Sequence, residues 1–95
     1  MKRNEIVLTL NENVYMGRIK GASICKEQVA PFIKKNEQNI IVIPATSKVI
    51  SGSFVDGLNL PIRNNYLWKG SVRHEGSERF IEIELLPRFD SKPKI

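Results

Sequence analysis

The stretch that decides the fold runs from Ile41 to Leu58 and reads IVIPATSKVISGSFVDGL. Its start continues an apolar run, NIIVI, that begins at Asn39 and has no polar alternation. Such a run is typical of a central strand that is covered on both faces, with helices on at least one side of its sheet. Pro44 has no backbone N–H to donate, so we expect the strand to cover 39–43 and to end there.

The second half of this stretch has the features of a short helix. Ser51 and Ser53 are good N-cap residues, because a hydroxyl accepts a hydrogen bond from the free N–H groups of a first helical turn. Phe54 precedes Leu58 by four positions, which is the spacing of one helical face. Gly57 and the Asn-Leu-Pro that follows Leu58 predict that the helix ends within about two turns.

The N-terminal segment predicts a β-hairpin. EIVLTL at 5–10 alternates, with Ile6, Leu8 and Leu10 on one face, which is the pattern of a half-buried strand. Asn-Glu-Asn then reads as a turn, and VYMGRI at 14–19 as a second strand that pairs back on the first.

An amphipathic helix is expected over about 23–36, with Ser23 as its N-cap. Cys25 and Val29 belong to its apolar face, so we interpret Cys25 as a small core residue and not as a reactive thiol. Pro31 conflicts with a continuous helix, because proline removes a hydrogen bond and clashes with the preceding turn. We expect a kink there; the alternative is that Pro31 opens a second short helix.

The C-terminal third predicts a second hairpin, YLWKGSVRHEGSERFIEIELLP. Gly76-Ser77 suits the loop of a type II′ turn between two alternating runs. One register then satisfies both faces of the hairpin. It pairs Val72 with Ile81, Trp68 with Leu85, and Lys69 with Glu84.

Together these elements predict one α+β or α/β domain over residues 1–95. It has a single small sheet of four to five strands, two helices packed on that sheet, and a C-terminal β-hairpin. A chain of 95 residues has room for one core. A short polar tail is expected at about 88–95.

Composition favours a cytoplasmic protein. No apolar run exceeds four residues, and the start lacks the pattern of a signal peptide, so neither a membrane span nor secretion is expected. Cys25 is the single cysteine and cannot form an internal disulfide. Fifteen Lys and Arg against ten Asp and Glu leave a net charge of +5, scattered along the chain, which we interpret mainly as solvated surface.

Chemistry-bearing motifs do not point to an enzyme. His74 is the single histidine, so no metal site is expected, and no glycine-rich phosphate loop follows a strand. A Ser-His-Asp triad would need His74, which lies beside a hairpin turn where a solvated histidine is the simpler interpretation. We therefore expect no catalytic residue and no cofactor.

An aromatic residue interleaved with bases keeps a nucleic-acid interpretation open. Aromatic side chains stack on bases, and cations neutralise phosphates. The candidates are Trp68, Lys69, Arg73 and Arg79. The hairpin register counts against this interpretation, since it turns Lys69 and Arg73 away from Trp68.

The order of GRIKG, a helix, NIIVI and ISGSFVDGL resembles the STAS-like domain family of unknown function over residues 5–58. That family has an Arg-x-x-Gly step into a helix, a central strand, and a serine-rich turn into a second helix. The matching positions are Arg18 and Gly21, then Ser51, Ser53, Phe54, Asp56 and Leu58.

This resemblance implies a binding module. In the wider STAS group, which includes anti-sigma-factor antagonists, a serine at the start of the helix after the central strand is phosphorylated and that end docks on a partner. Gly52 stands at the matching position here, between two serines, and we interpret those serines as helix caps. The predicted contact surface consists of Ser51, Ser53, Phe54, Asp56 and Arg63.

Four functional hypotheses follow from the sequence. The leading one is a small, non-enzymatic, regulatory module of a prokaryote or phage that binds another protein. The second is a nucleic-acid-binding protein. The third is an inhibitor of a host enzyme, encoded by a phage or mobile element. The fourth is a domain that forms homodimers through its edge strands.

Overall fold

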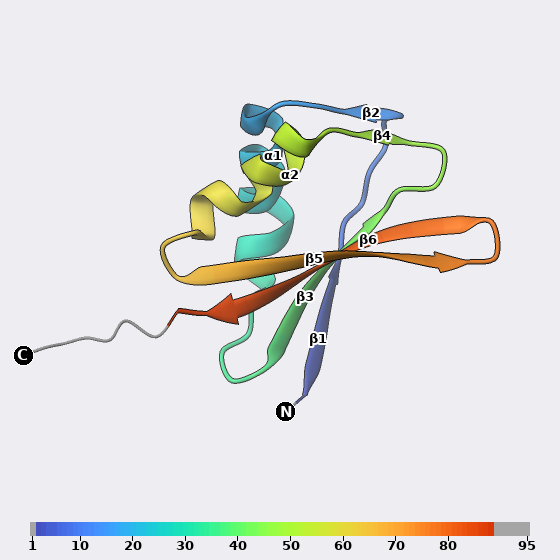
Figure 1. Ribbon diagram of the computed structural model, residues 1–95. Coiled ribbons are helices and arrows are strands. Elements are labelled where there is room, and N and C mark those ends of the chain that lie inside the picture. The colour runs from blue at the N-terminus through green and yellow to red at the C-terminus, as the bar shows by residue number, and fades with distance from the viewer. Residues whose placement is uncertain (1, 89–95) are drawn as a thin grey trace, which may run out of the picture.

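Six strands, two α-helices and three further helical turns make up the fold in Figure 1, a computed structural model that describes residues 2–88. The polar tail expected at about 88–95 lies outside the described residues, apart from Arg88. In chain order the elements are β1 (Arg3–Val7), β2 (Val14–Tyr15), α1 (Arg18–Ile24), the π-helical turn η1 (Cys25–Val29), the 3₁₀ turn η2 (Ala30–Phe32), β3 (Gln38–Pro44), β4 (Val49–Ile50), α2 (Gly52–Asn59), the 3₁₀ turn η3 (Leu60–Ile62), β5 (Tyr66–Glu75) and β6 (Glu78–Pro87).

The main sheet is mixed and has four strands in the order β1-β3-β6-β5. β1 and β3 run parallel, whereas β6 runs antiparallel to both of its neighbours. A small second sheet pairs β2 with β4 in parallel. The helices cover one face of the main sheet (Figure 1), so the α+β class and the C-terminal hairpin expected from the sequence are confirmed.

β3 is the buried central strand that the sequence predicts. Ile41 and Ile43 point into the core between sheet and helices. Ile40 and Val42 point to the other face and are also buried, although none of the helices within residues 2–88 lies on that side. Long charged and polar side chains of the neighbouring strands flank them; in the same row as Ile40, Glu84 accepts a hydrogen bond from Gln38 at 2.8 Å.

The C-terminal hairpin has the predicted register. Val72 faces Ile81, Trp68 faces Leu85 and Lys69 faces Glu84. Glu75 and Glu78 close the ladder, so the loop is the dipeptide Gly76-Ser77. Gly76 has a φ of +60°, which a type II′ turn requires at its first position.

The N-terminal hairpin predicted from the sequence is wrong. β1 ends at Val7 and pairs with β3, and β2 pairs with β4 instead of folding back on β1. Ile6 and Leu8 are buried, as the alternation predicts. The alternation is a local signal, and it says nothing about which distant strand each segment pairs with.

The first helix begins earlier and ends sooner than expected. α1 starts at Arg18 after a Gly17 N-cap, so Ser23 lies inside the helix and caps nothing. The helix continues into a π-helical turn and then into a 3₁₀ turn that begins at Ala30 and has Pro31 as its second residue. The alternative interpretation of Pro31, as the first turn of a short second helix, is therefore the correct one.

The two helices cross in direct backbone contact. A Cβ atom added to Gly57 would lie 2.3 Å from the carbonyl oxygen of Arg18, and one added to Gly21 would lie 2.2 Å from that of Phe54. Any side chain at either position would push the helices apart. Gly57 thus packs the helix pair and does not end α2, which continues to Asn59.

The core lies between this helix pair and the inner face of the main sheet. Neither helix, within residues 2–88, has the length and apolarity that crossing a membrane requires. The side chains of the core come from both the sheet and the helices: Ile6, Leu8, Tyr15, Cys25, Val29, Ile41, Ile43, Phe54, Leu58, Ile62, Ile83 and Leu85.

Gly57→Ala is expected to lower the free energy of unfolding by about 3 kcal/mol, the upper range for overpacking a core. The atoms that the new Cβ would meet belong to the backbone of Arg18, which cannot move aside. Urea unfolding followed by circular dichroism measures the change. Gly52→Ala is the matched control: a Cβ there meets nothing within 4 Å, so stability should be unchanged or slightly raised. Equal effects of the two substitutions would contradict the close crossing.

Candidate functional site

The two helices begin next to each other because the strands before them pair in parallel. Val14 faces Val49 and Tyr15 faces Ile50 in the small sheet. Each strand enters its helix within a few residues. The backbone N–H of Gly17, at the start of α1, consequently lies at the start of α2.

Serine hydroxyls join the two helix starts. Ser51 is the N-cap of α2, as predicted, and its Oγ accepts from the N–H of Phe54 at 3.1 Å. The N–H of Gly17 donates to Ser53 Oγ at 3.2 Å and to Ser51 Oγ at 3.4 Å. The two hydroxyl oxygens lie 3.0 Å apart. Both serines are half-buried and engaged, whereas Gly52 between them is exposed and has no hydroxyl.

An ion pair stands beside these serines on the surface. Arg18 Nη2 lies 3.2 Å from Asp56 Oδ2, and both side chains are more than half exposed. Solvent screens such a pair, so it contributes at most about 1 kcal/mol to stability. Both groups can therefore exchange this contact for a contact with another molecule at little cost.

Four exposed apolar side chains lie around the helix starts. Val14 and Val49 face each other on the outer side of the small sheet, and Met16 follows two residues after Val14. Ile19, in the first turn of α1, is 89% exposed. Met16, Ile19 and Ser53 line one shallow hollow of about 770 Å³. We call the surface of Val14, Met16, Ile19, Val49 and Ser53 the helix-start face.

The structure brings together only part of the contact surface predicted from the sequence. Ser51, Ser53 and Asp56 lie at the start of α2. Phe54 has no exposed surface and packs against Tyr15 with ring centroids 5.4 Å apart, so its assignment to a contact surface is wrong. Arg63 is exposed but follows η3, at the opposite end of α2.

Sequence reasoning missed the apolar members of the helix-start face. Val14, Met16 and Ile19 fall in the segment that the alternation assigned to a hairpin strand. The available signal was Gly17, which interrupts that strand pattern and has a φ of +90°. A helix start at Gly17 would have placed Ile19 in the first turn of α1.

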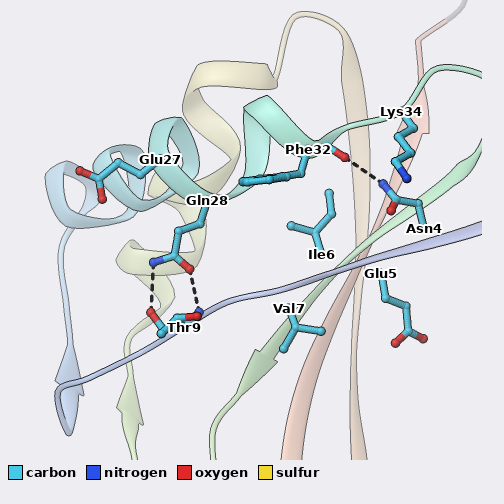
Figure 2. Close-up of a pocket in the computed structure, with 9 residues that line it drawn as sticks. All are labelled: Asn4, Glu5, Ile6, Val7, Thr9, Glu27, Gln28, Phe32 and Lys34. Atoms are coloured by element: carbon cyan, nitrogen blue, oxygen red, sulfur yellow. Dashed lines mark hydrogen bonds between the residues drawn. The ribbon is translucent and has the colours of Figure 1, made fainter.

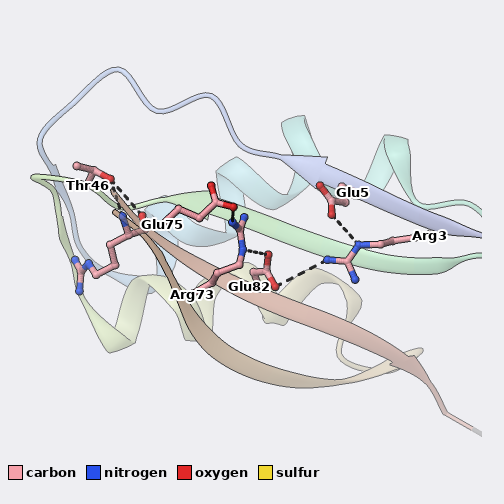
Figure 3. A network of polar contacts seen from close by, with 7 residues as sticks. Arg3, Glu5, Thr46, Arg73, Glu75 and Glu82 are labelled. Carbon is pink, nitrogen blue, oxygen red and sulfur yellow. Dashed lines mark hydrogen bonds and ion pairs between the residues drawn. The ribbon is translucent and has the colours of Figure 1, made fainter. Parts of the chain in front are cut away.

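The basic candidates for nucleic-acid binding lie on different faces. Trp68 is half-buried on the inner face of β5, whereas Lys69 and Arg73 point to the opposite face. Arg73 already contacts Glu82 at 2.8 Å and Glu75 at 2.7 Å, as Figure 3 shows, and stacks on Phe80 at 4.5 Å. The hydrogen bond to Glu82 raises the pKa of the Arg73 guanidinium above its ordinary value.

Arg79 is likewise held by its own chain. Its Nη2 donates to the carbonyl oxygens of Ala45 and Lys48, both at 3.3 Å. Its backbone N–H donates to Thr46 Oγ1 at 2.9 Å. The four candidates thus form no shared surface that could follow a phosphate backbone.

A hollow of about 480 Å³ lies along the free edge of β1 (Figure 2). Two polar side chains bridge its strand and helical walls. Gln28 donates to the carbonyl oxygen of Thr9 at 3.0 Å and accepts from its N–H at 2.7 Å. Asn4 donates to the carbonyl oxygen of Phe32 at 2.9 Å. These contacts satisfy backbone groups that a ligand in the hollow would otherwise use.

Cys25 and His74 are the single cysteine and the single histidine of the chain. Among residues 2–88, no three His, Cys, Asp or Glu side chains lie close enough to hold a metal ion. Cys25 is fully buried, as predicted, and burial raises the pKa of its thiol to about 11, so the thiolate is scarce at neutral pH. His74 is exposed near the tip of the hairpin.

The chain was also compared with known proteins. No family model, no curated protein and no solved structure matches it.

Ser51→Ala is expected to lower the free energy of unfolding by about 1 kcal/mol, because the N–H of Phe54 loses its cap. Thermal and urea unfolding provide the measurement. Ser23→Ala is the control, since Ser23 is exposed inside α1 and alanine has the highest helix propensity. A larger loss from Ser23→Ala than from Ser51→Ala would contradict this assignment of the caps.

Proposed function

We propose that this chain is a small, non-enzymatic protein-binding module that contacts a partner protein through the helix-start face. The observation that carries the proposal is the group of four exposed apolar side chains at one place on the surface: Val14, Met16, Ile19 and Val49. Single exposed apolar residues are ordinary, but a contiguous apolar patch with polar neighbours marks interaction surfaces.

Burial of these side chains supplies the binding free energy. Ile19 is the most exposed of the four, with 89% of its surface exposed, and Met16, which lines the same hollow, is 61% exposed. Covering one such side chain contributes about 1.5–3 kcal/mol before the costs of association. Both residues line the same hollow, so one apolar side chain of a partner inserted there would contact them together.

Polar groups around the patch supply orientation. Arg18 and Asp56 form the exposed ion pair beside Ser53, and Lys20 lies 3.0 Å from Glu12. Lys48 donates to the carbonyl oxygen of Glu12 at 2.6 Å. Arg18, Lys20 and Lys48 outnumber the two acids, so the partner surface that fits best is an apolar centre with a carboxylate at its edge.

Two further observations support a regulatory module of the cytoplasm. The resemblance of residues 5–58 to the STAS-like family implies a binding module of this class. The single buried Cys25 suits a reducing compartment. The proposal includes neither a cofactor nor a catalytic step.

The experiment is capture of a partner from lysate of the native host, followed by measurement of Kd with the purified partner. Ile19→Glu is expected to weaken binding at least tenfold, because it places a charge where the partner covers an apolar side chain. A carboxylate in the first turn of α1 favours the helix dipole, so the fold is retained. Ser53→Glu should act in the same direction.

Val7→Glu is the matched control, because Val7 is 56% exposed on the open face of the main sheet, away from the helix-start face. It should leave Kd unchanged. Binding should also change little between low and high salt. Equal Kd values for Ile19→Glu and Val7→Glu would overturn the proposal. Retention of a nucleic acid alone, lost as salt rises, would overturn it as well.

A further inference from the structure

β5 is the last strand on one side of the main sheet and offers a long free edge. It has ten residues and pairs with β6 without a bulge. Proteins usually blunt such an edge with proline, a bulge or a covering side chain, because its unpaired groups can pair with another strand. Within residues 2–88, no strand lies on the outer side of β5.

The hairpin register shows which backbone groups of β5 face outward. In a two-residue hairpin the residues that flank the loop exchange both of their hydrogen bonds, and such pairs recur at every second position. Glu75 and Glu78 flank the loop. The N–H of Arg88 donates to the carbonyl oxygen of Asn65 at 3.0 Å. Asn65 lies an even number of residues before Glu75, so this bond fits the same alternation. The residues whose N–H and C=O groups point to the free edge are therefore Tyr66, Trp68, Gly70, Val72 and His74.

The opposite edge of the sheet, at β1, is shorter, and a side chain covers part of it. β1 has five residues, and the side-chain amide of Gln28 occupies both backbone groups of Thr9 where the edge continues beyond the strand (Figure 2). This amide takes the position that a neighbouring strand would take. β5 has no comparable bridge among the described residues, so it is the edge that remains open.

The inner face of β5 is covered along only half of its length. Trp68 packs against the core, while Gly70, Val72 and His74 are exposed. The outer part of the hairpin extends beyond the helices in Figure 1. Val72 is 55% exposed although it is an apolar residue on the face that elsewhere forms the core.

We propose that two copies of this chain pair through their β5 strands, antiparallel, with Gly70 on the two-fold axis. In this arrangement the half of β5 whose inner face is exposed lies beside the half of the other β5 whose inner face packs on the core. Val72 of one copy then faces Trp68 of the second copy. Five residues of each strand face their counterparts, which gives about ten intermolecular hydrogen bonds. The two sheets become one continuous sheet of eight strands.

Charge disfavours the two registers next to this one. With Gly70 on the axis, Lys69 of one copy faces Ser71 of the other, and like charges are not opposed. A shift of the axis to residue 69 would oppose Lys69 with Lys69 of the second copy. A shift to residue 71 would oppose Lys69 with Arg73 of the second copy.

Charge also fits at the two ends of the paired strands. Glu75 and Glu78 stand at the tip of the hairpin. Arg63 and Arg88 stand at its base, where Arg88 Nε donates to the carbonyl oxygen of Arg63 at 2.7 Å. No carboxylate within residues 2–88 lies within 4 Å of either arginine. Glu75 pairs with Arg73 of its own chain, whereas Glu78 forms no ion pair among residues 2–88. Antiparallel pairing brings the tip that carries Glu78 toward the base of the other copy, where Arg63 and Arg88 stand.

Val72→Pro tests the pairing, because the N–H it removes points to the free edge and not to β6. The measurement is sedimentation equilibrium from about 1 to about 100 µM, a range that covers weak specific dimers. The native chain is expected to form a dimer, and the variant to associate at least tenfold more weakly. Val72→Thr keeps the N–H and should remain dimeric. Circular dichroism checks that each variant is folded. A native chain that is monomeric over the whole range would overturn the proposal.

Gly70→Cys tests the register independently of Val72→Pro. Residues that face each other on the axis have Cα atoms about 5.5 Å apart, within reach of a disulfide. A Cβ at this position meets a Trp68 ring atom at 3.5 Å, an ordinary contact. Mild oxidation should therefore link two copies. Cys25 does not compete, because it is buried and its thiol pKa is raised to about 11.

Ser71→Cys is the matched control, since residue 71 lies off the axis and on the other face of the sheet. Equal cross-linking of the two cysteine variants would overturn the register. The helix-start face shares no residue with β5. Ile19→Glu should consequently leave the dimer intact, and Val72→Pro should leave the intrinsic affinity of one helix-start face for its partner intact.

Discussion

The contact between two glycines and the backbone of the facing helix determines the arrangement of this fold. Gly21 of α1 and Gly57 of α2 each lie where a Cβ would come within 2.5 Å of a carbonyl oxygen of the other helix. The helices therefore cross without side chains between them. Together with the parallel pairing of β2 and β4, this close approach lets the N–H of Gly17 reach the hydroxyls of Ser51 and Ser53, so both helix starts lie on one surface.

Local signals in the sequence predicted much of the fold. The apolar run of β3 has no alternation because both of its faces are buried. The hairpin register follows from a two-residue loop and complementary cross-strand pairs. The cap at Ser51 follows from a hydroxyl placed before an apolar helical face. In each case the residues that determine the structure are close in sequence or oppose each other across one turn.

The remaining features depend on distant partners, which one sequence does not identify. Pairing of β1 with β3 and of β2 with β4 joins segments more than thirty residues apart. By propensity, Gly21 and Gly57 look like helix breakers. In the structure, their lack of a side chain leaves room for the backbone of the facing helix. The burial of Phe54 could have been predicted, since the spacing that predicts α2 puts Phe54 on the same face as Leu58, and both are buried.

The two proposed surfaces have a joint consequence. A dimer through β5 is symmetric, so it would present two helix-start faces that are related by the two-fold axis. Each face offers a small apolar area around Ile19 and Met16, which alone supports modest affinity. Two faces held at a fixed separation bind a partner that carries two matching sites much more tightly than one face does, through effective concentration and without new contacts. The open edge of β5 would thus increase the avidity of a binding surface with which it shares no residue.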